Sequence, residues 1–313
     1  MRIYYAGDIH GSEKCWRKFL NAAEFYEADV LVLGGDLTGK ALVPVVARGD
    51  GSWAAHVLGR DEVVRDEEAL AELEKRVRFN GFYPYRCDEA DYARLADDPE
   101  HRDRVIGEVM QAELRRWVEI ADAKLSGSSV RCLVMPGNDD EFEIDAILDS
   151  AERLENPDGG VVRVGDYQVV SCAWANPTPW DSPRELPEDE LEAKLEGIAA
   201  ALEPGVPAIF NLHCPPFDSG LDMAPQLTED LRVVRKGGEQ VIVPVGSKAV
   251  RRVIERHQPL LGLHGHIHES RAAATIGRTL CLNPGSVYSE GVVDGVLVDL
   301  DGDRVVRHQF VQG

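Results

Sequence analysis

Short runs that are apolar at nearly every position recur along this chain, and five of them lead into short polar turns. Such runs are typical of strands covered on both faces, because a half-exposed strand alternates apolar and polar residues. We therefore predict an α/β protein. The predicted strands are Ile3–Ala6, Val30–Leu33, Val130–Met135, Val161–Val164, Val169–Ala173, Ala208–Leu212, Leu260–Leu263, Thr279–Leu282, Val296–Leu300 and Arg304–Phe310.

Helical patterns separate the early strands. Glu13–Ala28 places Trp16, Phe19 and Leu20 on one face, which is the spacing of an amphipathic helix. Ser247–Arg256 begins with a serine suited to capping a helix. The last two strands are joined by Asp-Gly-Asp, which favours a hairpin.

Two stretches interrupt this alternation, residues 39–127 and 176–202. The first contains a hairpin pattern and then charged helices, and it is too long for a loop and too charged for a central core. We interpret it as a cap inserted into one domain that spans 1–313, and 176–202 as a possible lid. The expected elements are Ala41–Arg48, Trp53–Leu58, Asp66–Phe79, Asp88–Ala96 and Pro99–Leu125, and in the lid an acidic helix from about Pro187.

Side chains that can bind metal ions follow five of the predicted strands. Oxygen and imidazole groups gathered at the carboxyl ends of strands are what a two-metal hydrolytic centre requires. Asp8 and His10 are two residues apart, and so are His266 and His268. In an extended backbone both members of such a pair face the same side. The seven candidates are Asp8, His10, Asp36, Asn138, His213, His266 and His268.

Each of these residues also has a simpler interpretation. Asp8, Asp36 and Asn138 are residue types that favour turns, and a single histidine such as His213 is more often satisfied within a loop. The metal interpretation depends on all five sites occurring together at strand ends.

The charge of the chain limits its partners. With 34 lysines and arginines against 55 aspartates and glutamates, the net charge is −21. That field repels nucleic acid and anionic membranes, so we expect neither an extended nucleic-acid interface nor membrane association. It would also repel a phosphorylated substrate unless bound cations reverse the sign locally.

Two further features of the sequence suggest the cellular compartment of the protein. No segment approaches the roughly 20 apolar residues of a membrane span. The six cysteines are widely spaced and include no Cys-x-x-Cys pair, so we expect a reducing cytoplasm.

The order of the motifs resembles the calcineurin-like metallophosphoesterase superfamily. The blocks Gly-Asp-Ile-His, Gly-Gly-Asp, Gly-Asn-Asp-Asp, a single histidine and Gly-His-Ile-His follow one another, and Asn283-Pro284-Gly285-Ser286 resembles the closing turn of that family. The resemblance implies a four-layer αββα sandwich and two divalent cations.

By the same resemblance, one cation is held by Asp8, His10, Asp36 and His268. The second is held by Asp36, Asn138, His213 and His266, with the Asp36 carboxylate bridging. The absence of thiolate suits Mn²⁺, Fe, Co²⁺, Ni²⁺ or catalytic Zn²⁺, and we favour Mn²⁺.

One position departs from the family pattern. Asp139 stands where the family has a histidine assigned as general acid or phosphate contact. A carboxylate beside two dications is a poor proton donor, and it repels a dianionic monoester more than a monoanionic diester. Alternatively, Asp139 turns away and caps a helix near Glu141. His264 is a candidate for the missing acid, and the alternative is that it belongs to the core. Arg235 and Lys236 could contact phosphate oxygens, but we favour a surface role for both.

These inferences combine into one hypothesis, a metal-dependent phosphoester hydrolase that prefers diesters. The cations would lower the pKa of a shared water and direct hydroxide at phosphorus. Asn138, Asp139 and His264 are the candidate catalytic residues, and the expected partner is a small phosphoester. The alternatives are a phosphomonoesterase acting on proteins or nucleotides, a nuclease for short oligonucleotides, and a non-catalytic metal-binding scaffold.

Overall fold

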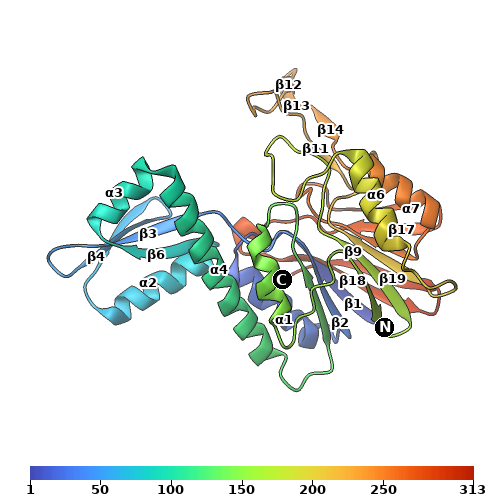
Figure 1. Cartoon of the computed structure of the whole chain (residues 1–313), viewed down its shortest axis with the longest axis horizontal. Coiled ribbons are helices and arrows are strands. Elements are labelled where there is room, and N and C mark those ends of the chain that lie inside the picture. Colours follow the sequence, from blue (N-terminus) through green and yellow to red (C-terminus); the bar gives the residue numbers. More distant parts are fainter.

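Two β-sheets packed face to face form the centre of the protein in a computed structural model that describes all 313 residues (Figure 1). One sheet has the order β19-β18-β1-β2-β7 and the other β16-β17-β15-β10-β9-β8. The first comprises β1 (Arg2–Ala6), β2 (Val30–Gly34), β7 (Arg131–Met135), β18 (Asp294–Asp301) and β19 (Arg304–Gln312). The second comprises β8 (Val161–Val164), β9 (Tyr167–Cys172), β10 (Ala208–Leu212), β15 (Leu261–Leu263), β16 (Ala272–Ile276) and β17 (Thr279–Asn283).

The strands at the centre of each sheet are parallel. In the first sheet β1, β2 and β7 run in the same direction, and in the second β9, β10, β15 and β17 do so. The antiparallel strands are β18 in the first sheet, which lies between β19 and β1, and the edge strands β16 and β8 in the second. The carboxyl ends of the parallel strands in each sheet therefore meet at one end of that sheet, where ligands bind in open α/β sheets.

Three apolar clusters create four layers. Residues such as Tyr5, Val32 and Leu263 are buried between the two sheets. On the outer face of the first sheet pack α1 (Glu13–Phe25), α4 (Pro99–Lys124) and α5 (Asp145–Asp149). The outer face of the second is covered by α6 (Glu188–Ala199) and α7 (Lys248–His257). The predicted αββα sandwich is confirmed.

The caps of the helices explain their boundaries. The Ser247 hydroxyl accepts a hydrogen bond from the Val250 N–H at the start of α7, as its sequence predicts. Helix α1 ends earlier than predicted, because Glu27 adopts a left-handed conformation with φ of 52° that no helix can continue.

Residues 39–127, here called the insert, begin with a separate unit at the left of Figure 1 and end with α4, which packs on the sandwich. Its sheet has the order β5-β4-β3-β6, and α2 and α3 pack beside it around a small core of its own. Its strands are β3 (Leu42–Ala47), β4 (Trp53–Val57), β5 (Arg60–Val64) and β6 (Tyr83–Cys87), and its first helices are α2 (Glu67–Phe79) and α3 (Glu89–Asp97). Helix α4 then leads back to the sandwich, where Trp117 stacks on Trp16 with ring centroids 5.4 Å apart.

Two smaller features complete the fold. Residues 223–244, the arm, project from the sandwich at the top of Figure 1 and contain β11 (Met223–Pro225), β12 (Arg235–Lys236), β13 (Glu239–Gln240) and β14 (Ile242–Pro244). Short 3₁₀ turns occur at Phe142–Ile144 and Tyr288–Glu290. None of the helices has the length and apolar character that crossing a lipid bilayer demands.

Candidate metal centre

The seven predicted side chains converge at the carboxyl ends of β1, β2, β7, β10 and β15. Asp8, His10, Asp36 and His266 all have positive φ, between 38° and 66°. This region is rarely occupied by residues other than glycine, and such strain is found where surrounding contacts fix a functional geometry.

Backbone hydrogen bonds fix the turns against one another. The Asp8 N–H donates to the Gly35 carbonyl at 2.9 Å, and the His10 N–H donates to the Asp36 carbonyl at 3.0 Å. Gly137 lies so close to Asp36 that a Cβ there would be 2.8 Å from the Asp36 Cγ atom. Glycine at this position lets the turn that carries Asn138, the third in chain order, approach the turn that carries Asp36, the second.

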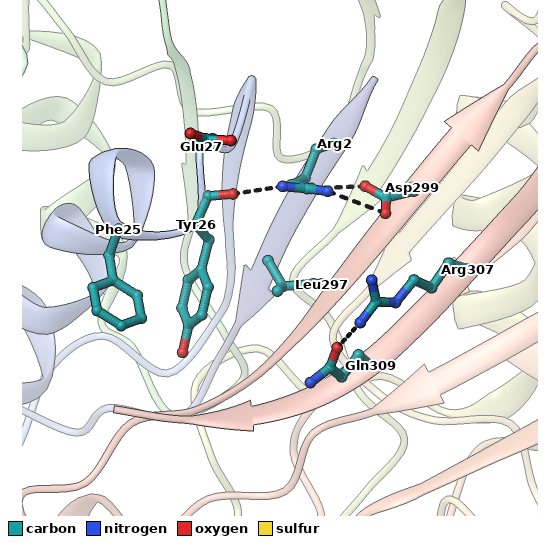
Figure 2. Close-up of a pocket in the computed structure, with 8 residues that line it drawn as sticks. All are labelled: Arg2, Phe25, Tyr26, Glu27, Leu297, Asp299, Arg307 and Gln309. Carbon is teal, nitrogen blue, oxygen red and sulfur yellow. Dashed lines mark hydrogen bonds and ion pairs between the residues drawn. The ribbon is translucent and has the colours of Figure 1, made fainter.

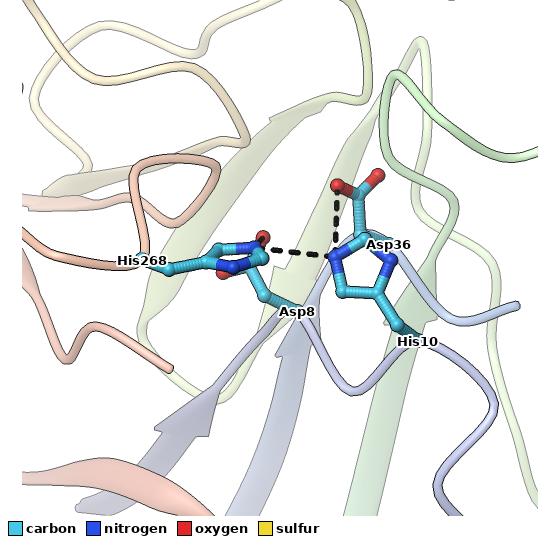
Figure 3. A group of neighbouring side chains, drawn as sticks. All are labelled: Asp8, His10, Asp36 and His268. Atoms are coloured by element: carbon cyan, nitrogen blue, oxygen red, sulfur yellow. Dashed lines mark hydrogen bonds and ion pairs between the residues drawn. The ribbon is translucent and has the colours of Figure 1, made fainter. Parts of the chain in front are cut away.

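One group of side chains contains Asp8, His10, Asp36 and His268 (Figure 3), whose nearest donor atoms all lie within 4.8 Å of one another. His10 Nε2 lies 3.2 Å from His268 Nε2 and 3.6 Å from Asp36 Oδ2. His268 Nε2 lies 3.6 Å from Asp8 Oδ1. Figure 3 shows these side chains pointing toward one another, with Asp8 and His10 on one loop and His268 on another.

A second group contains Asp36, His213 and His266, again with donor atoms within 4.8 Å. His213 Nε2 lies 3.4 Å from Asp36 Oδ2 and 3.0 Å from Asn138 Oδ1. Asp36 Oδ2 is therefore close to an imidazole nitrogen of each group, and Asn138 joins the second.

Surrounding groups orient these side chains. The Gly34 carbonyl accepts a hydrogen bond from His213 Nδ1 at 2.8 Å, which directs Nε2 to the centre. Asp36 Oδ1 accepts a hydrogen bond from the Asp139 N–H at 3.0 Å, and Asp8 Oδ1 accepts one from the His266 N–H at 2.9 Å.

Charge at the centre is set by burial and by close pairs. Burial raises the pKa of the Asp36 carboxyl, but His213 and His10 outweigh it and hold that pKa well below its usual range. Burial lowers the pKa of His213, but Asp36 raises it to a net value of about 9. Burial lowers the pKa of His266 to about 4, so this ring is neutral near pH 7. The centre thus contains an ionised carboxylate and a neutral imidazole, both of which bind metal ions.

These residues fit divalent cations on three further grounds. Asp8 Oδ2 is fully buried and has no hydrogen-bond partner in the protein, although buried carboxylate oxygens are normally paired. His10 and His268 turn their Nε2 atoms toward each other at 3.2 Å, so two imidazole donors face one point. The donor set is oxygen and imidazole, since the nearby Cys214 Sγ is hydrogen-bonded to Asn176 instead.

Asp139 faces the rim of the centre. Its Oδ1 lies 2.6 Å from Lys40 Nζ and its Oδ2 lies 3.9 Å from His10 Nδ1. The alternative of a helix cap is wrong, because the 3₁₀ turn that begins at Phe142 has no side-chain cap.

His264 belongs to the core. It has no exposed surface, and its Nδ1 is hydrogen-bonded to the Leu212 carbonyl at 2.9 Å. Its Nε2 lies beside Gly262, back along β15 and away from the centre. The structure therefore gives no support to His264 as the acid. Arg235 and Lys236 are exposed on the arm, in agreement with the surface interpretation.

Three residues at the centre were not predicted. Buried Asp140 accepts hydrogen bonds from Leu37 N–H, Thr38 N–H and Gly137 N–H at 2.8–2.9 Å and so joins the second turn to the third. The sequence contained a sign of this residue, because Asp140 is the last residue of the block Gly-Asn-Asp-Asp that carries the family resemblance. The Tyr288 ring lies 4.8 Å from the His10 ring. Neither Tyr288 nor Lys40 has a motif that identifies it.

A pocket of about 210 Å³ lies elsewhere, between the end of α1 and strands β18 and β19 (Figure 2). Arg2 in this pocket begins β1, whereas Asp8 follows the end of that strand. Arg2 is paired with Asp299 at 2.8 Å and donates to the Tyr26 carbonyl at 2.9 Å. These are ion-pair and packing contacts remote from the metal centre.

Comparison with known proteins shows which family the chain belongs to. It matches no protein-family model. It is 30% identical over 202 residues to MJ1162, an uncharacterized protein of Methanocaldococcus jannaschii, and the match covers 63% of this chain and 78% of that protein. The chain belongs to the same family as MJ1162.

Solved structures agree on the fold. The protein TT1561 of Thermus thermophilus has a TM-score of 0.56 and 16% identity, over 100% of this chain and 97% of that chain. This likeness establishes a shared fold and leaves function open. A structure described as a novel archaeal phosphodiesterase has a TM-score of only 0.36 at 10% identity, over 100% of both chains. A likeness that weak has no bearing on function.

Proposed function

We propose that this protein is a metal-dependent phosphoester hydrolase with a two-metal centre and a preference for phosphodiesters. The supporting observation is the position of Asp36, whose carboxylate lies between two groups of buried donors, 3.6 Å from His10 and 3.4 Å from His213. A carboxylate shared in this way is suited to bridge two cations. Two-metal centres of this kind serve hydrolysis of phosphoesters.

The residues divide between two cations. Asp8, His10, Asp36 and His268 would hold one, and Asp36, Asn138, His213 and His266 the other, with Mn²⁺ as our favoured metal. When bound, the cations would supply Lewis acidity that polarises the phosphoryl group and makes water acidic enough to attack near pH 7.

The protein itself contributes to hydrolysis by holding the ligand side chains in position. The Gly34 carbonyl holds the His213 ring, and the Asp139 N–H holds the Asp36 carboxylate. Asn138 Oδ1 is turned to His213, which leaves the amide N–H₂ able to donate to a phosphoryl oxygen.

The segment 176–202, our possible lid, is anchored to the same loop. The Arg184 N–H donates to the Asn138 carbonyl at 3.1 Å. Its buried guanidinium donates to the carbonyls of Asp140 and Glu141 at 3.1 Å. On the other side, the Gly39 N–H at the start of the insert donates to the Tyr83 hydroxyl in β6 at 2.8 Å, which fixes the insert where it leaves the second turn. We propose that both segments form walls of the substrate site.

Preference for diesters follows from Asp139. A carboxylate at the rim repels the second negative charge of a monoester, which a diester lacks. One observation favours a monoesterase instead, namely the Lys40 ammonium that neutralises Asp139 at 2.6 Å. Initial rates on bis(p-nitrophenyl) phosphate and p-nitrophenyl phosphate, measured in parallel with Mn²⁺, decide between the two.

Substitutions test the centre itself. D36N and H213A should each reduce hydrolysis by at least about a thousandfold, because each removes a ligand or bridge of the reacting centre. D61N and H56A are matched controls, since both residues are exposed on the insert. Full activity of D36N in a preparation free of host phosphatase would refute the assignment. Two bound Mn²⁺ per chain without turnover of any ester would favour the scaffold alternative.

A further inference from the structure

Lys40 lies where the sandwich passes into the insert, two residues before β3. Its ammonium is 2.6 Å from Asp139 Oδ1. Asp139 in turn contacts two of the candidate ligands, because its N–H donates to Asp36 Oδ1 at 3.0 Å and its Oδ2 lies 3.9 Å from His10 Nδ1. The lysine is thus one side chain removed from the bridging carboxylate.

The backbone on both sides of this ion pair is anchored. Asp140 accepts hydrogen bonds from the Thr38 N–H at 2.8 Å and from the Thr38 hydroxyl at 2.5 Å. The Gly39 N–H is bonded to Tyr83. The segments that carry Lys40 and Asp139 are therefore held together by buried contacts, and the ion pair is not needed to join them.

The pair itself is open to solvent. The Lys40 side chain is 46% exposed and that of Asp139 is 28% exposed. Exposed ion pairs of this kind add little to folding stability, so stability gives a weak reason for the pair. An ammonium has three N–H donors, and Asp139 engages one of them, which leaves two that can turn to a ligand.

The distribution of charge around the centre also points to Lys40. No other lysine or arginine side chain forms an ion pair with Asp8, Asp36 or Asp139, whose other ion-pair partners are histidines. In a chain of net charge −21, this ammonium is the fixed cation beside the centre. An anion held at the centre would meet it at the rim.

We propose that Lys40 is a substrate-binding residue that donates to a non-bridging phosphoryl oxygen, and that Asp139 is the residue that positions it. This inference rests on the proposed function. It assigns to a lysine at the start of the insert, together with a carboxylate from the third turn, the anion-contacting position at which the family that the sequence resembles has a histidine. Lys40 partly offsets the charge of Asp139, so removal of Lys40 alone leaves the substrate facing an unpaired carboxylate.

Binding of inorganic phosphate tests this without turnover. Calorimetric titration of phosphate into the Mn²⁺-loaded protein should show about tenfold weaker binding for K40M and a change of less than about threefold for K40R, since charge-assisted hydrogen bonds are the strong ones. D139N placed in the K40M protein should recover part of the loss by removing the unpaired carboxylate. K75M is the matched control, because Lys75 forms an exposed ion pair with Glu72 in the insert. Manganese content is measured on the same samples.

The outcomes separate the two proposals. If K40M binds phosphate as tightly as the parent protein, or if D139N recovers nothing in its background, the assignment of Lys40 and Asp139 is overturned while hydrolysis by the parent stands. If the parent binds phosphate through Lys40 but hydrolyses no ester, the proposed function fails and the binding site stands. A parent protein that binds no phosphate overturns the inference.

Discussion

Substitution of Gly137 by alanine tests how closely the third turn must approach Asp36. The added Cβ would lie 2.8 Å from the Asp36 Cγ atom and closer still to Oδ1 and the backbone nitrogen. Ordinary contact begins at 3.4 Å, so Cγ and the new Cβ must separate by 0.6 Å (3.4 − 2.8) to reach it, and the nearer atoms by more. Gly137 has no positive φ, so the cost is one of space alone.

Two measurable losses follow from that displacement. Overpacking of this kind costs about 1–3 kcal/mol of stability, and we expect the upper end because a backbone atom is among those displaced. A shift approaching 1 Å at a reacting centre can reduce the rate by about a hundredfold. Mn²⁺ affinity should fall as well, because the carboxylate that moves is the shared one.

Urea unfolding in the presence of a chelator gives the stability change, and calorimetric Mn²⁺ titration gives the affinity. G197A is the matched control. Gly197 lies within α6 with no atom within 4 Å of an added Cβ, so the same substitution should stabilise the protein by about 0.5–1 kcal/mol. A G137A protein that unfolds within about 0.5 kcal/mol of the parent and binds Mn²⁺ equally well would show that the turn is looser than argued.

Two further predictions concern metal and pH. Chelation should abolish hydrolysis and lower the midpoint of thermal unfolding, and Mn²⁺ at about a hundred times its Kd should return about 2.7 kcal/mol per site; a midpoint unchanged by chelation and reconstitution would contradict binding at these buried donors. Burial raises the pKa of Glu13, but hydrogen bonds from Arg116 and Arg17 outweigh it and lower that pKa below its usual 4.5. Its stabilising contribution is therefore present above about pH 4.5 and lost as pH falls through the lower folded value. E13Q should be less stable than the parent at pH 7, and the gap in urea midpoints should close on acidification; a gap that stays constant with pH would exclude the ionised carboxylate as its cause.

Much of the sandwich was predictable because its strands carry a local signal. The strands that lead to the centre were located to within one residue at each end, since runs buried on both faces are apolar throughout. Two strands of the insert were missed for equally local reasons. β5 begins Arg-Asp-Glu, and β6 contains Pro84, which counts against a strand.

His264 and His266 show where a prediction from local sequence spacing fails. A spacing of two residues predicts that His264 and His266 face the same side, as they would in an extended strand. His266 instead has a φ of 66°. The turn breaks the alternation, so His266 reaches the centre while His264 stays in the core.

By itself the sequence determined the chemistry of the donors and the strand ends on which they stand, because both depend on residues within a few positions of each other. Tertiary structure decided which donors meet. Asp36 approaches His213 from another sheet, and Lys40 meets Asp139 across 99 positions of chain. Such contacts depend on how the two sheets pack and on where each turn points, and no short segment carries that information.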